Sequence, residues 1–140
     1  MCVPNWPEDF YDAHLRHWED AELLFTEGRL ANADHLYGLS AECGLKAVWI
    51  DAGMLRVPRE HVNDFWATFS RRFRASLRNV PNQQSLVRAI RRGNPFGNWN
   101  VSQRYAPRRC FDQNLVEEHR RAAEEICALV RTWRIGRVTP

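Results

Sequence analysis

The sequence has almost no lysine, because nineteen of its twenty basic residues are arginine. It has no apolar run near the roughly 20 residues that span a bilayer. Its four cysteines include no Cys-x-x-Cys pair, and it lacks the basic and then apolar opening of a secretory signal. These absences argue against a membrane protein, a disulfide scaffold and a secreted protein. We expect a reduced, cytoplasmic protein with a single domain over residues 1–140.

Acidic residues are absent from one long stretch. Residues 65–111 hold ten arginines and no Asp or Glu, whereas residues 1–64 hold twelve acids against five bases. Guanidinium groups bind phosphate in a bidentate manner and stack on bases, so such a block is typical of a nucleic-acid site. The block could also face the acidic first part of the chain, within the fold or across a dimer. The sequence leaves both interpretations open.

Apolar residues recur at helical spacing in five segments, and no segment has a strand pattern. Five helices are predicted. The first runs from Pro7 to Gly28, the second spans Ala33–Ala52, and the third runs from His61 to a stop at Pro81. The fourth runs from Gln83 to Arg92, and the last spans Asp112–Ile135 and ends before Gly136. Asp112 is expected to cap the last helix. Residues 93–111 are predicted to form a long ordered loop, or a loop with a short turn. The fold class is therefore all-α, an antiparallel bundle of four to five helices.

The helix predicted at Ala33–Ala52 has the most informative pattern. Glycine inside a helix costs about 1 kcal/mol relative to alanine, so Gly38 and Gly44 predict that a neighbouring helix approaches closely there. Glu42 and Lys46 are four residues apart with the acid first, a spacing that favours an ion pair on one face. We expect the rest of the chain to pack on this helix.

The histidines do not form a pattern typical of metal binding. His14 and His17 lack the i, i+4 spacing of a metal pair, so both are expected at the surface or rim of the first helix. His119 falls on the apolar stripe of the last helix and is predicted to be a hydrogen-bonded core histidine. No glycine-rich phosphate loop indicates a nucleotide cofactor. The sequence predicts no metal and no cofactor.

Four stretches together resemble the HEPN superfamily, small helical bundles of prokaryotic toxin, phage-defence and RNA-processing systems. They are the first helix with Trp18 and Ala21, the stretch from His35 to Ala47 with its Ala-Glu-x-x-Leu-Lys-Ala element, the stretch His61–Trp66, and the late stretch Trp99–Tyr105. The resemblance spans most of the chain and implies a helical bundle that works as a homodimer.

Catalytic members of that superfamily are metal-independent endoribonucleases with paired Arg-x4-6-His motifs. At the matching place this chain has Arg104, with no histidine five to seven residues further on. Literal matches occur elsewhere, at Arg29 with His35 and at Arg56 with His61, at about the number expected by chance. The resemblance implies Arg104 and His61 as catalytic residues. His61 also has a structural interpretation, as the residue that starts the third helix.

Two functions follow from these observations. In the first, the chain binds or cleaves RNA in a toxin-antitoxin or phage-defence system, Arg104, Arg108 and Arg109 bind phosphate, and Trp99 and Tyr105 stack on bases. The structural alternatives are that Trp99 fills the core and that Arg104 pairs with Glu42. In the second function, the chain is a non-catalytic dimeric interaction module whose partner is a nucleotidyltransferase-like protein or a larger defence complex.

Overall fold

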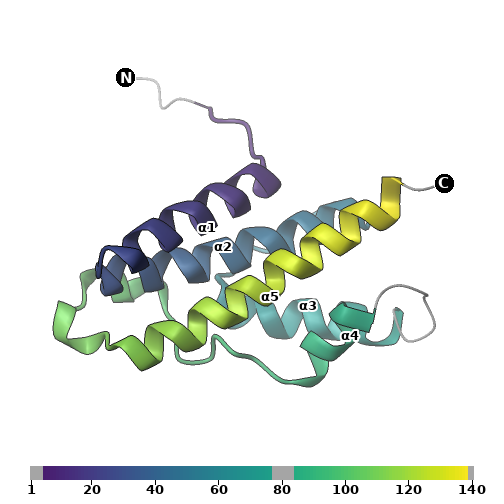
Figure 1. Ribbon diagram of the computed structural model, residues 1–140. Helices are drawn as coiled ribbons and strands as arrows, with labels where there is room; N and C mark the ends of the chain where they lie inside the picture. The colour runs from purple at the N-terminus through teal and green to yellow at the C-terminus, as the bar shows by residue number, and fades with distance from the viewer. Residues whose placement is uncertain (1–4, 77–83, 139–140) are drawn as a thin grey trace.

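A computed structural model describes residues 5–76 and 84–138, and these residues form a bundle of helices (Figure 1). The elements are α1 Phe10–Thr26, α2 Leu30–Asp51, α3 Val62–Ser76, α4 Gln84–Arg91, the 3₁₀ turns η1 Val101–Tyr105 and η2 Arg108–Cys110, and α5 Gln113–Val138. The two described ranges contain no strand, so the predicted all-α bundle is confirmed. None of their helices combines the length and apolar character that crossing a membrane requires.

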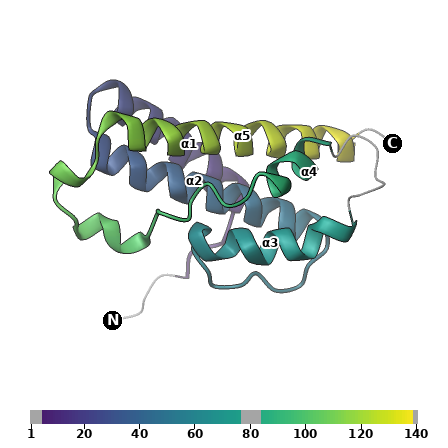
Figure 2. The same ribbon diagram turned by 90° about the horizontal axis from the view of Figure 1, so that it is seen from below.

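Helix α2 lies at the centre of the bundle, between α1, α3 and α5 (Figures 1 and 2). From Ala33 to Trp49 every residue is buried except His35, Leu36 and Leu39. A helix that is enclosed on almost all sides needs small or apolar residues around its whole circumference. This explains why the sequence there is rich in alanine, glycine and leucine, and it confirms that other elements pack on this helix.

The directions of the helices follow from contacts at their ends. Helix α5 runs in the same direction as α2, because Asp34 contacts His119 near the start of both helices and Asp51 pairs with Arg134 near their ends (Figure 2). The predicted antiparallel arrangement is therefore wrong for this pair, because the long loop before α5 carries the chain back to the start of α2. Helix α1 runs antiparallel to α2 (Figure 1). The loop after α4 returns the chain to the end of the bundle where α2 begins, so α5 starts there (Figure 2).

The two glycines of α2 contact different partners. A β-carbon at Gly44 would stand 2.7 Å from the His14 ring and 2.9 Å from Ile126, so α1 and α5 approach closely there, as predicted. A β-carbon at Gly38 would stand 2.0 Å from the indole of Trp99, so the neighbour there is this side chain and not another helix. The prediction of a helix contact at Gly38 is therefore wrong, because a side chain of the loop fills that space.

The space beside Gly44 also accounts for His14. This residue was predicted at the surface or rim, but it is only 1% exposed, and its Nδ1 lies 2.8 Å from the carbonyl oxygen of Ser40. The ring enters the core because glycine leaves room for it and Ser40 supplies a polar partner. His17, on the same helix, is half-buried at the rim, as predicted.

The helix ends differ in part from the prediction. Asp112 caps α5, since its Oδ1 accepts from the Leu115 amide at 2.8 Å, as predicted. Gly136 does not end α5, which continues to Val138, because a helix tolerates a glycine at a cost of about 1 kcal/mol. Helix α2 begins at Leu30, three residues before the predicted Ala33. The predicted stop at Pro81 lies outside the described residues.

Candidate functional site

The indole of Trp99 fixes the 93–111 loop to α2. Trp99 is 1% exposed, and its Nε1 donates to the carbonyl oxygen of Asp34 at 3.0 Å. The ring also lies against the backbone of Gly38. The prediction that Trp99 stacks on bases is therefore wrong, because the ring has no face free for a ligand. The alternative, that Trp99 fills the core, is confirmed.

Asp34 is a buried carboxylate that joins α2 to α5 and to the loop. Its Oδ1 accepts from Nδ1 of His119 at 2.6 Å, and its Oδ2 accepts from Nε2 of Gln103 at 2.7 Å. The other ring nitrogen of His119 lies 2.7 Å from Oδ1 of Asn98, so the predicted core role of His119 is confirmed. Because Gln103 directly precedes Arg104, these bonds also hold the backbone that carries Arg104.

Glu42 is the second buried carboxylate of α2. Lys46 Nζ donates to its Oε2 at 3.0 Å, which confirms the predicted pair, and His61 Nδ1 lies 3.0 Å from its Oε1. Both oxygens are thus engaged, and the alternative pairing of Glu42 with Arg104 is wrong. The guanidinium of Arg104 instead lies 4.9 Å from the centre of the Tyr105 ring.

His61 combines a structural position with an exposed ring. Its carbonyl oxygen accepts from the Phe65 amide at 2.7 Å, so His61 does start α3, as the structural interpretation predicts. Its side chain is nevertheless 47% exposed. A carboxylate can only accept, so Nδ1 carries the proton that faces Glu42, and Nε2 is left free for another partner. The two interpretations of His61 are therefore compatible.

His35 lies against the same indole as His61. Its ring is stacked on Trp99 with centroids 5.7 Å apart, and the His61 ring lies 6.4 Å from Trp99. Burial lowers the pKa of His35, and the positive charge of Arg104 lowers that pKa further. His35 is therefore largely neutral at pH 7. Within the described part of the chain, its buried Nδ1 has no hydrogen-bond partner.

Sequence reasoning considered His35 only through its spacing from Arg29 and missed its place in this group. The signal was present, because His35, Glu42 and Lys46 are seven and then four residues apart and so share one face of α2. Burial is the main reason that the pKa of His17 of α1 is lowered. The charge of Glu42 raises this pKa and that of His35 lowers it, so His17 lies near both residues. In the two described ranges no three His, Cys, Asp or Glu side chains are grouped to hold a metal ion.

Comparison with known proteins identifies no relative. No family model, curated protein or solved structure matches the chain. The resemblance to the HEPN superfamily therefore stays a prediction, and the site has to be interpreted from its own geometry.

The predicted RNA-binding residues other than Trp99 lie at the surface, on η1 and η2. Tyr105 is 78% exposed, so its ring can offer a face to a base, and the three arginines Arg104, Arg108 and Arg109 are exposed beside it. Within the described chain no ion pair joins any of these three arginines to a carboxylate, whereas Arg92 pairs with Glu125 of α5. These arginines therefore make no described ion pair with the acids of the first part of the chain.

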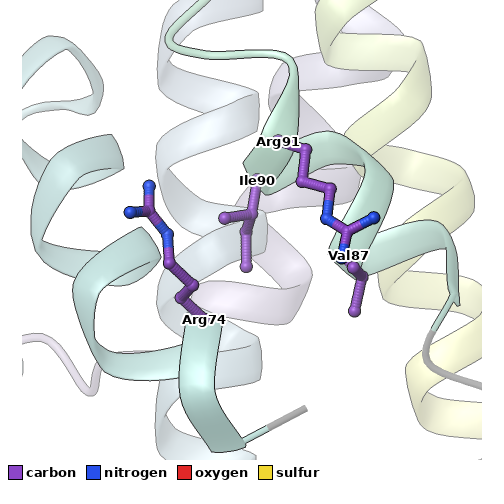
Figure 3. Close-up of a pocket in the computed structure, with 4 residues that line it drawn as sticks. All are labelled: Arg74, Val87, Ile90 and Arg91. Carbon is purple, nitrogen blue, oxygen red and sulfur yellow. The ribbon is translucent and has the colours of Figure 1, made fainter. Parts of the chain in front are cut away.

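Other described arginines of the block lie elsewhere. Arg74 and Arg91 line a hollow of about 260 Å³ between α3 and α4, with Val87 and Ile90. Figure 3 shows Ile90 between the two arginine side chains. Figures 1 and 2 place α4 and the η1–η2 segment at opposite ends of the bundle. The block is therefore divided into two basic regions, and only the η1–η2 region adjoins the histidines.

Proposed function

We propose that this protein binds RNA and cleaves it by attack of a ribose 2′-hydroxyl, as a HEPN-like ribonuclease of a prokaryotic toxin-antitoxin or phage-defence system. The observation that carries the proposal is the pair of imidazoles, His35 and His61, against one indole, with the positive charge of Arg104 near His35. A base, an acid and a cation near phosphate are the groups that such a cleavage needs.

Each group has a role in a balanced step. Neutral His35 takes the proton of the 2′-hydroxyl while the 2′-oxygen forms a bond to phosphorus. His61, as the imidazolium, gives a proton to the 5′-oxygen as the bond from phosphorus to that oxygen breaks. Arg104 binds the phosphate oxygens, whose negative charge increases in the transition state. The products are a 2′,3′-cyclic phosphate and a 5′-hydroxyl.

Glu42 supports this assignment of His61. Its carboxylate is buried, it is held on the other side by Lys46, and it contacts Nδ1 of His61 at 3.0 Å. A fixed carboxylate selects one tautomer and one orientation of the ring, so Nε2 points away from Glu42. The described cysteines are unpaired, which supports a reducing cytoplasm as the place of action.

The test is an RNA cleavage assay. The purified protein is incubated with total tRNA and with a single-stranded RNA in EDTA. The chelator tests whether the reaction needs a metal ion, and none is expected because every proposed catalytic group is a side chain. We expect cleavage with cyclic phosphate ends. Because acid-base groups contribute about 10²–10⁴-fold, His35→Ala and His61→Asn should each lower the rate at least about 100-fold. The His61→Asn variant keeps an N–H for Glu42. Arg104→Ala should lower the rate to a similar degree.

Two controls make the assay decisive. Arg131 is exposed on α5, so Arg131→Ala removes the same charge away from the site and should leave the rate unchanged. An all-2′-deoxy oligonucleotide should stay intact, because it lacks the attacking hydroxyl. Equal cleavage by all variants would identify a contaminating nuclease and refute the proposal.

Intact RNA under these conditions would favour the second candidate, a non-catalytic module that binds another copy or a nucleotidyltransferase-like partner. An observation that favours this candidate is the exposure of Leu15 and Leu23 on α1, since exposed apolar side chains are typical of contact surfaces. Light scattering of the purified protein would then measure whether it is a homodimer, and Leu23→Glu should convert a dimer through this surface to a monomer.

A further inference from the structure

A basic hollow lies where the turn between α1 and α2 meets the η1–η2 segment. Its volume is about 310 Å³, and its lining includes Arg29 from the turn, Arg104 from η1 and Arg108 from η2. Ligand pockets in proteins begin at about 300 Å³, so this hollow is large enough for a phosphate with part of its sugar. Three arginines from two parts of the chain that are far apart in sequence thus border one space.

No carboxylate of the described residues pairs with these arginines. The hollow has no acidic side chain in its described lining, and no described ion pair involves Arg29, Arg104 or Arg108. Asp34 lies in the same part of α2, but it is fully buried and bonded to His119 and Gln103. Like charges that share a space repel one another, so a bound anion would stabilise this arrangement.

The polar groups around the hollow suit phosphate in particular. Guanidinium forks bind phosphate oxygens in a bidentate manner, and Asn32, exposed in the first turn of α2, adds a side-chain amide. Arg29 is the N-cap residue of α2 and is exposed, and its side chain makes no hydrogen bond or ion pair within the described residues, so it can turn toward a ligand. Gly28 has φ 75°, a conformation that ends α1 and brings Arg29 to the rim.

We propose that this hollow is a phosphate subsite, which binds one phosphate group of an RNA strand through Arg29 and Arg108, next to the phosphate that Arg104 binds for cleavage. The identity of the strand as RNA rests on the proposed function, whereas the binding of phosphate does not. Because Gln103, next to Arg104, is bonded to Asp34, next to His35, a strand anchored here would place its neighbouring nucleotides near His35 and His61. The phosphate is either internal or a terminal monoester.

The first experiment uses inorganic phosphate and thermal unfolding. A ligand that binds only the folded state raises the melting temperature, so phosphate should raise it relative to chloride at equal ionic strength. Arg29→Gln and Arg108→Gln should each reduce this rise, whereas Arg131→Gln should not. An equal rise in all variants, or a rise lost only in Arg91→Gln at the hollow of Figure 3, would overturn the proposal.

The second experiment distinguishes the two sources of phosphate. The affinities of a short RNA with a 5′-phosphate and of the same RNA with a 5′-hydroxyl are measured with the His61→Asn variant, which prevents cleavage. If a terminal group is bound, the 5′-phosphate should strengthen binding about tenfold or more, and Arg29→Gln should remove that gain. If an internal phosphate is bound, both RNAs should bind equally and Arg29→Gln should weaken both.

The outcomes separate this proposal from the proposed function. If the wild-type protein does not cleave RNA but shows the expected phosphate effects, only the proposed ribonuclease is refuted. If it cleaves RNA, but Arg29→Gln and Arg108→Gln change neither the RNA affinity nor the response to phosphate, only the subsite is refuted.

Discussion

Replacement of Gly38 by alanine should destabilise the protein although it improves the local helix. Alanine is favoured over glycine in a helix by about 1 kcal/mol. The added β-carbon would stand 2.0 Å from Cε2 and 2.1 Å from Nε1 of Trp99, so the indole must leave its position. Loss of a buried tryptophan costs about 3–5 kcal/mol. The net loss in the free energy of unfolding should therefore be about 2–4 kcal/mol.

The assay is urea unfolding followed by far-UV circular dichroism, with two comparison variants. Gly136→Ala, in α5, places its β-carbon in open space and should be neutral or up to about 1 kcal/mol stabilising. In the Trp99→Ala background the clash is absent, so Gly38→Ala should no longer destabilise. The explanation fails if Gly38→Ala unfolds at the urea concentration of the wild type, or if its cost is the same with and without Trp99.

Two further predictions concern the buried polar groups. Burial lowers the pKa of His14 below its ordinary value of 6.5. Above pH 6.5 the ring is neutral in the folded and the unfolded protein, so its titration costs no stability. As the pH falls from 6.5 toward the folded-state pKa, the unfolded chain takes up a proton that the folded protein does not, and the free energy of unfolding decreases. The unfolding free energy should drop below pH 6.5 by up to about 1.4 kcal/mol per pH unit for this residue, and His14→Gln, measured by urea titration from pH 7.5 to 5, should show a smaller drop. Asp34→Asn should cost about 1–3 kcal/mol, because an amide has only one accepting oxygen for the two buried donors, His119 and Gln103, that the carboxylate accepts from. Amide exchange over residues 99–105 should accelerate, whereas Asp20→Asn at an exposed position should change neither quantity.

The helices were predictable because their signals are local. Asp112 caps α5 within one turn, and Glu42 pairs with Lys46 within one turn, so the spacing alone determines both contacts. The core role of His119 was also predictable, because its position on an apolar stripe buries it whatever its partner is. Repeating apolar residues therefore determined most of the fold, except for helix ends such as Gly136.

The site was less predictable because its contacts join distant parts of the chain. His14 is buried by Gly44 and Ser40, which lie in the next helix, and Trp99 is buried by Gly38 and Asp34. An aromatic residue in a polar loop has the same sequence pattern whether it binds a base or fills a space in the core. The arginine block was a clear signal, but its division between the two ends of the bundle depends on where α4 packs.

The bonds of Trp99 to α2 have a consequence for the order of folding. The turn that joins α1 and α2 is only three residues long, whereas the bond from Trp99 to Asp34 joins residues 65 positions apart. Loop-closure entropy rises with the number of residues enclosed, so we expect the hairpin of α1 and α2 to form early and the loop to dock late. Arg104 would then meet His35 and His61 only in the last step. A nascent chain would therefore carry the α1–α2 hairpin before it carries the assembled site, and the arginines of the turn and of the loop would come together only once the loop has docked.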